Sequence, residues 1–210
     1  MVDTKAPEPL ELGLRERKKL RTERELCDAA LRLMVEKGFD QVTIDDIAAE
    51  VEVSKTTFYR YFDSKEDALL GKTTEKLEQI RAALDEQPAS EPTLSAVRIA
   101  IMSLINSYEH DRDESLARGR IIRETPSLIA RNLEHQLAWE GVVAEFVASR
   151  LGDDPDAPLR SRIVAAIVIA TLRATLDYWR DTEGAEDLPV LMNTALGMLA
   201  EKRAALVSRS

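Results

Sequence analysis

The chain has 210 residues, of which 44% are hydrophobic and 32% charged. It can therefore bury a core without disulfides or metals, and collagen-like, low-complexity and wholly disordered classes are excluded. Its longest apolar run, residues 163–172, is about half of the ~20 residues that a bilayer-spanning helix needs, and residues 1–13 lack the pattern of a secretory signal. We expect a cytoplasmic protein with no membrane partner, in which the single cysteine, Cys27, packs in the core.

The formal net charge of −9 argues at first against nucleic-acid binding, because binding DNA requires cations that neutralise phosphates. Between Arg15 and Arg24, however, six residues are basic and two are acidic, while acid dominates the remainder. This segment can bind DNA through one end of the chain. We expect Arg21 and Arg24 to lie in an ordered helical turn beside the phosphates, and Arg15, Arg17 and Lys18 to form a flexible arm in the minor groove. The alternative is a solvated helix face.

The basic segment lies in the first of two helices that are predicted in this part of the chain. Apolar residues at helical spacing indicate an amphipathic helix over about residues 16–37, which ends at Gly38. A short helix follows over residues 43–50, because Thr43 and Asp46 have the spacing of a capping box.

A third helix is predicted over residues 55–62, after the cap Ser54. Phe58 and Phe62 share its apolar side. The other side carries Lys55, Thr56, Tyr59 and Arg60. Two short helices joined by a tight turn and braced by a longer one form a helix-turn-helix. Cations, hydroxyls and a phenol suit base edges and phosphates, so we predict that these four residues face the major groove.

Thr43 and Lys65 are predicted to contact the DNA backbone. Lys65 follows the cap Ser64 in the first turn of the next helix, where the helix dipole normally makes a cation unfavourable. A phosphate bound at this helix end would make the cation favourable. The alternative is that Glu66 and Asp67 neutralise Lys65, which is then merely exposed.

Three segments, residues 43–48 (TIDDIA), 53–62 (VSKTTFYRYF) and 64–66 (SKE), closely resemble in register the amino-terminal signature of the TetR family of bacterial transcriptional regulators. Two departures are Glu52 in the turn and Thr56 in the recognition helix, where many members have glycine. A non-glycine residue with positive φ in such a turn costs about 1 kcal/mol.

The resemblance implies an all-α homodimer of about nine helices per chain that binds a palindromic double-stranded DNA operator. After a flexible tail, residues 1–14, a three-helix DNA-binding domain would span residues 15–63. A helical ligand-binding and dimerisation domain would span residues 64–210.

Apolar periodicity predicts further helices in the second domain without reference to any family. The expected elements are a helix from residue 64 to about 84, a loop at 87–92, a helix over about 94–108, a short segment around 121–122, and a long helix over about 127–151. Residues 163–170 are apolar nearly all round, and a second apolar stripe covers residues 188–199. Two such helices and their symmetry mates would form a four-helix dimer interface. The alternative is the core of a monomer.

An effector pocket is predicted among the long helices, where large or polar groups interrupt apolar faces. The candidate lining residues are Met102, Ile105, Tyr108, Trp139, Val143 and Phe146, with His135 and Arg173 as anchors for a polar or anionic group. Arg173 interrupts an apolar helix, and a buried guanidinium needs a partner. The alternative is that the aromatic residues are ordinary core.

No motif of a serine hydrolase, a phosphate-binding loop or a zinc protease occurs, and the two histidines lack ligand spacing. We therefore expect no catalysis, no cofactor and no metal. In the carboxy-terminal half, residues 120–123 (RIIR), 134–136 (EHQ), 139–140 (WE) and 177–179 (DYW) more weakly resemble the mycofactocin-regulator group. This resemblance implies a fatty or acyl-thioester effector. The predicted function is a ligand-responsive repressor that a small hydrophobic or acyl-type effector releases from its operator. The alternative is a helical small-molecule carrier or enzyme that does not bind DNA.

Overall fold

The computed structural model describes residues 13–207, except for the side chains of Leu14, Glu16 and residues 72–74 and 200–207. Within that range the chain is all helical, with no β-strand. Its nine α-helices are α1 (Leu14–Lys37), α2 (Ile44–Glu50), α3 (Lys55–Phe58), α4 (Lys65–Asp85), α5 (Thr93–His110), α6 (Arg112–Glu124), α7 (Pro126–Leu151), α8 (Ala157–Asp181) and α9 (Leu188–Val207). The predicted fold class is confirmed. Most of the predicted tail, residues 1–12, lies outside the described residues.

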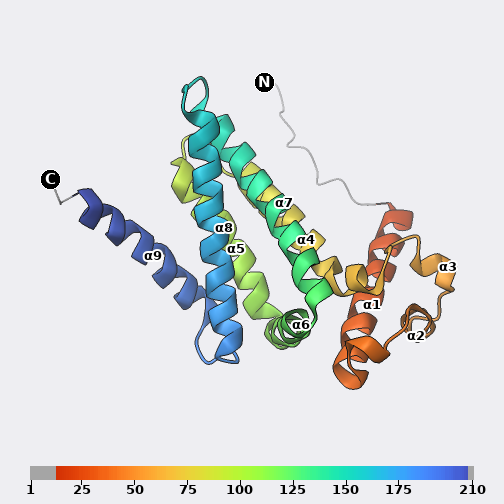
Figure 1. Ribbon diagram of the computed structural model, residues 1–210. Helices are drawn as coiled ribbons and strands as arrows, with labels where there is room; N and C mark the ends of the chain where they lie inside the picture. Colours follow the sequence, from red (N-terminus) through yellow and green to blue (C-terminus); the bar gives the residue numbers. More distant parts are fainter. Residues whose placement is uncertain (1–12, 208–210) are drawn as a thin grey trace, which may run out of the picture.

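Helix ends follow local signals in the sequence. Gly38 adopts φ 85° and ends α1, and Pro126 opens α7 at a position where no intrahelical N–H is needed. The predicted loop at 87–92 separates α4 from α5. Figure 1 shows the result: α1 to α3 form one body, and the long helices α4, α5, α7 and α8 form a second body beside it.

The core of the first body is closed by residues from far along the chain. Side chains of α1, α2, α3 and the start of α4 pack together with Ile121, Ile122 and Leu128 of α6 and α7. Cys27 lies in this core, as predicted, and burial raises the pKa of its thiol to about 12. The boundary at residue 63 stays a prediction, but the packing of the first body continues beyond it.

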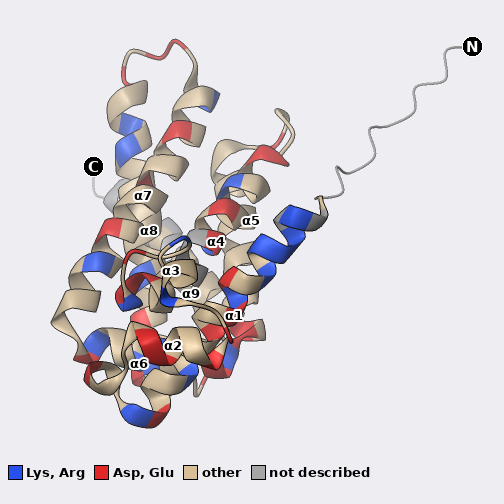
Figure 2. Ribbon diagram, turned by 90° about the vertical axis from the view of Figure 1, so that its right-hand side faces the viewer, with Lys and Arg blue, Asp and Glu red and all other residues tan. Residues whose placement is uncertain are grey.

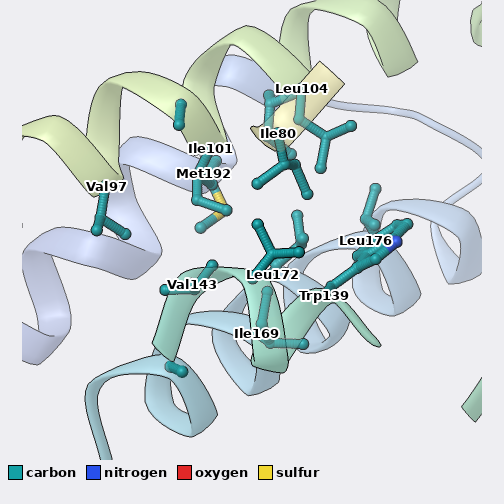
Figure 3. Packing of buried hydrophobic residues seen from close by; sticks show 14 of the residues in the cluster. Ile80, Val97, Ile101, Leu104, Trp139, Val143, Ile169, Leu172, Leu176 and Met192 are labelled. Carbon is teal, nitrogen blue, oxygen red and sulfur yellow. The ribbon is translucent and has the colours of Figure 1, made fainter. Parts of the chain in front are cut away.

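The core of the second body comes from five helices, α4, α5, α7, α8 and α9. Figure 3 shows part of this cluster, in which Ile80, Leu104, Trp139, Leu172 and Leu176 lie side by side. Apolar packing of this extent is the main stabilising contribution to such a bundle.

The outer faces of α8 and α9 remain uncovered in the single chain. Figure 1 shows α9 projecting away from the long helices towards the C-terminus. The exposed apolar residues on these helices include Leu159, Ile163, Ile167, Val190, Met198 and Leu199. No helix in the described part of the chain is long and apolar enough to cross a membrane.

Candidate nucleic-acid interface

Two side-chain caps hold the helix-turn-helix. Thr43 forms the predicted capping box with Asp46: its Oγ accepts a hydrogen bond from the Asp46 N–H at 3.1 Å, and the Thr43 N–H donates to Asp46 Oδ2 at 2.9 Å. These hydrogen bonds lower the pKa of Asp46. Ser54 Oγ accepts from the Thr57 N–H at 3.0 Å and begins α3. The α-helical part of α3 covers only Lys55–Phe58, so the predicted end at residue 62 is wrong; a turn continues the chain from Tyr59 to Tyr61.

One side of α3 is buried and the other is exposed to solvent. Phe58 is fully buried, and its ring lies 5.9 Å from that of Phe62, which is also buried. The four predicted groove-facing residues, Lys55, Thr56, Tyr59 and Arg60, are all exposed. The arrangement presents hydrogen-bond donors on a rigid surface, which is what contact with base edges requires. Their contact with DNA stays a prediction.

The turn before α3 contains a strained residue. Glu52 has φ 56°, which is the left-handed region that favours glycine. Glutamate in place of glycine at this position therefore lowers the stability of the fold by the expected amount, about 1 kcal/mol.

Lys55 is held by an acidic neighbour from α2. Its Nζ lies 2.8 Å from Asp45 Oδ2, and this pairing raises the pKa of Lys55. Both side chains are exposed, so the pair is weak and a phosphate or a base edge can displace the carboxylate.

Lys65 takes a role that neither sequence interpretation included. Its Nζ donates to the backbone oxygens of Phe39 at 2.8 Å and Val42 at 2.9 Å, and lies 4.3 Å from the centre of the Phe39 ring. The amine thus fastens the start of α4 to the segment between α1 and α2. The predicted contact of Lys65 with the DNA backbone stays a prediction, and it would compete with these two hydrogen bonds. The alternative, that Lys65 is merely exposed, is wrong, because the residue is half-buried.

The basic segment at the amino terminus is helical. Arg15, Arg17 and Lys18 lie in the first turns of α1, so the expectation of a flexible arm is wrong; Figure 2 shows their end of α1 as a cationic stretch. Arg21 pairs with Glu25 at 2.8 Å, one turn along α1. Arg24 Nε lies 3.0 Å from Glu75 Oε1 and joins α1 to α4. Phosphate contacts from Arg21 and Arg24 stay predictions that must compete with these pairs.

Most of the predicted effector residues come together. Ile105, Tyr108, Trp139 and Val143 are buried in the core of the second body, and Met102 and Phe146 pack against it (Figure 3 shows Trp139 and Val143). Burial raises the pKa of Tyr108, which stays neutral at physiological pH. Tyr108 of this set also lines a small cavity, which is described below.

The two predicted anchors lie elsewhere. Arg173 is exposed on α8, so the premise that its guanidinium is buried is wrong: it belongs to the outer face of that helix. His135 is half-buried on α7, where desolvation lowers its pKa. Its charged neighbours are Asp67 and Arg131, whose Oδ1 and Nε atoms form an ion pair of 2.7 Å. His135 therefore lies at the joint between α7 and the start of α4.

Sequence reasoning missed two arginines, the buried Arg118 of α6 and the half-buried Arg180 of α8, which line this cavity with Lys76 and Tyr108. A signal was present for Arg118, because it precedes Ile121 and Ile122 by one helical turn and so shares their buried face. Among the described residues, no group of three or more His, Cys, Asp or Glu side chains is placed to hold a metal ion.

Two family models match the chain. Residues 26–70 match the family described as bacterial regulatory proteins, tetR family, and residues 91–204 match the MftR C-terminal domain. The first match covers the helix-turn-helix, and the second covers α5 to α8 and most of α9.

Curated relatives match over nearly the whole chain. The transcriptional regulator TcmR of Streptomyces glaucescens is 33% identical over 195 residues, which cover 89% of this chain and 86% of TcmR. MftR of Mycobacterium tuberculosis, whose name ties it to mycofactocin biosynthesis, is 27% identical over 181 residues, with 86% and 88% covered.

Solved structures share the fold at lower identity. A TetR-family regulator from Syntrophomonas wolfei superposes with a TM-score of 0.70 at 18% identity, over 91% of this chain and 100% of that one. FadR from Bacillus subtilis, solved with stearoyl-CoA, superposes with a TM-score of 0.60 at 19% identity, over 84% of this chain and 96% of that one.

Proposed function

The chain belongs to the TetR family of bacterial transcriptional regulators, and from that premise we propose that it is a dimeric repressor that a small acyl-type or other hydrophobic effector releases from a palindromic operator. Its matched families and relatives are regulators and not enzymes. The observation that carries the proposal is the exposed surface of α3 and of the turn after it, which offers Lys55, Thr56, Tyr59 and Arg60 around the buried Phe58. Contact with chromosomal DNA would place the protein in the cytoplasm.

The uncovered faces of α8 and α9 support the dimer. Ile163 and Ile167 are 48% and 46% exposed, one turn apart on α8, and Val190 on α9 is 59% exposed. Burying such a stripe against its symmetry mate gains about 25 cal/mol for each Å² of apolar surface removed from water. A twofold dimer presents two copies of α3 to half-sites separated by about one helical turn, or a multiple of it, which is why the operator would be palindromic.

The acyl-type effector is supported by relatives with the same fold. FadR from Bacillus subtilis was solved with stearoyl-CoA, and FadR from Thermus thermophilus, with a TM-score of 0.56 at 21% identity, was solved with lauroyl-CoA. In this chain the apolar core between α4, α5, α7 and α8 is the region where an apolar chain would be accommodated.

The test is binding of a duplex from the region upstream of the protein's own gene, measured over a range of salt concentrations. Lys55→Ala should weaken binding by about 1–3 kcal/mol, or roughly 5- to 150-fold, and Tyr59→Phe by about 1 kcal/mol, with melting temperatures unchanged. Tyr178→Phe, which removes an exposed phenol from α8, is the control and should bind like the wild type. Wild-type affinity in both α3 variants would refute the assignment of this face, and absence of any duplex binding would favour the carrier or enzyme that does not bind DNA.

A further inference from the structure

A small cavity of about 30 Å³, partly open to solvent, lies where α4, α5, α6, α7 and α8 meet. Its lining includes three cationic side chains, from Lys76, Arg118 and Arg180, and two acidic ones, from Asp111 and Glu114. The lining therefore carries an excess of one positive charge. Tyr108 also lines it, with its phenol buried and neutral.

The two arginines carry buried N–H groups without acceptors. Arg118 is 9% exposed; one of its terminal nitrogens donates to the backbone oxygen of Leu69, while Nη2 has no hydrogen-bond partner within the described residues. The nearest ion-pair contact of Nη2, to Glu114 Oε2, is 3.9 Å long, which is too far for a hydrogen bond. Arg180 donates from Nη1 to Asp177 at 3.3 Å, and its buried Nε likewise has no acceptor in the described part of the chain.

Gly119 makes room for the Arg180 side chain beside the cavity. A Cβ on Gly119 of α6 would lie 2.5 Å from both Cδ and Nε of Arg180, so the side chain crosses α6 directly over this glycine. The absence of a side chain at residue 119 makes room for Arg180 to line the same cavity as Arg118.

Two unsatisfied buried guanidinium N–H groups are costly, because each donor has lost its water and gained no acceptor. Desolvation accordingly lowers the pKa of Arg118. An anion between the two arginines would accept from both. The cavity, of about 30 Å³, has room for a small anionic group, and a carboxylate can accept hydrogen bonds from two guanidinium groups at once.

We propose that this cavity binds the carboxylate of a free apolar carboxylic acid, between Arg118 and Arg180. The proposal rests on the proposed function, because it names the chemical class of the effector, and it favours a free acid over a coenzyme A thioester, which has no acyl carboxylate.

A third buried donor without an acceptor among the described residues lies near the cavity. The buried Nε1 of Trp139 has no hydrogen-bond partner within the described residues. Trp139 follows the cavity residue Asn132 by seven positions on α7, which is two turns or about 10 Å along the helix. An apolar tail would enter the neighbouring core only if packed side chains such as Val143 and Leu172 moved apart to admit it (Figure 3).

The position of the cavity also connects it with the DNA-binding body. α6 carries Arg118 on the cavity and, one turn later, Ile121 and Ile122 in the core beneath α1 and α4. A bound acid that draws α6 and α8 together would therefore move Ile121 and Ile122 and change how they pack beneath α1 and α4.

The experiment measures binding of decanoate by calorimetry and by the shift in melting temperature, with 1-decanol and decanoyl-CoA as uncharged and thioester probes. We expect decanoate to bind and to raise the melting temperature, with 1-decanol and decanoyl-CoA at least tenfold weaker. Arg180→Met should weaken decanoate at least tenfold. Arg120→Met, which removes an exposed arginine from α6, the helix that carries Arg118, is the control for loss of a positive charge and should bind decanoate like the wild type.

A second variant, Gly119→Ala, keeps both charges and displaces Arg180; it should also weaken decanoate at least tenfold, and it serves if Arg180→Met does not fold. Equal binding of 1-decanol, unchanged decanoate affinity in Arg180→Met or Gly119→Ala, or failure of decanoate to bind would overturn the site. Because these assays contain no DNA, their outcome is independent of operator binding, which tests the proposed function separately.

Discussion

At the scale of single residues, Lys65 illustrates how a cation in a DNA-binding body can be structural. Its ammonium satisfies two backbone oxygens and covers the Phe39 ring. A charged donor in this position stabilises the joint between α4 and the α1–α2 connection, because the two carbonyls are partly withdrawn from water.

Lys65→Met should therefore reduce stability by about 2 kcal/mol and lower the melting temperature by roughly 4–8 °C. The salt dependence of DNA binding should keep its slope, since no phosphate contact is lost. Lys37→Met, which removes an exposed lysine at the end of α1, is the control for loss of charge. A slope reduced by about one with an unchanged melting temperature would instead identify a phosphate contact.

Asp45 is the second residue whose replacement should change DNA binding in a specific way. Its carboxylate lies 2.8 Å from Lys55 Nζ and beside the proposed DNA face. Asp45→Asn should strengthen operator binding roughly three- to tenfold at moderate salt, because it frees Lys55 and removes a charge that repels phosphates.

The measurement is titration of labelled duplex with the variant and with Asp153→Asn. Asp153 is an exposed acid in the connection between α7 and α8, so it controls for the change in net charge. Weaker binding by Asp45→Asn than by wild type would mean that the aspartate itself positions Lys55 for the groove. Stability should change little, because exposed ion pairs contribute about 0–1 kcal/mol.

At the scale of elements, α8 and α9 are each half covered. Their inner faces supply Ile169, Leu172, Leu188 and Met192 to the core, while their outer faces stay apolar and exposed. A helix that is apolar nearly all round is stable in water only when several faces are covered, which one chain does not provide here.

Ile167→Asp should convert the protein to a monomer, because the carboxylate would be buried against its symmetry mate. Sedimentation velocity gives the mass, and operator affinity should fall by more than tenfold as the second half-site contact is lost. The control is Val35→Asp, an equally exposed apolar position on α1, which should leave the dimer intact. A wild-type mass for Ile167→Asp would place the dimer interface elsewhere.

At the scale of the whole molecule, the two bodies are joined through a shared core. Leu128 of α7 is fully buried in the core of the DNA-binding body together with Ile121 and Ile122. The ion pairs Arg24–Glu75 and Arg131–Asp67 fasten α4 to α1 and to α7. A disturbance in the second body is therefore transmitted to the first by packing.

Leu128→Ala should destabilise the DNA-binding body by about 2–5 kcal/mol although the residue lies far from it in sequence. Hydrogen exchange should show lower protection in α1 and α4, and operator affinity should fall in parallel. The neighbouring variant Ile129→Ala changes an exposed residue and should have no such effect. If protection falls only in α7 and α8, the two bodies are not coupled through this core.

The sequence by itself determined the features that depend on neighbours within a few residues. The caps at Thr43 and Ser54, the helix end at Gly38 and the division of α3 into a buried Phe58 side and an exposed side all follow from spacings of three or four positions. Such spacings fix which groups meet within one helical turn, whatever the rest of the chain does.

Tertiary structure alone decided which distant groups meet. Lys65 reaches acceptors 26 and 23 residues away, and Arg24 pairs with a carboxylate 51 residues away. Arg173 and Arg180 are seven positions apart and so lie on nearly the same side of α8, but Arg173 is exposed, whereas the Arg180 side chain lies over Gly119 of α6 and is 14% exposed. Which part of α8 lies against α6 is set by the packing of whole helices, so no local spacing distinguishes the arginine that faces solvent from the one that lines the cavity.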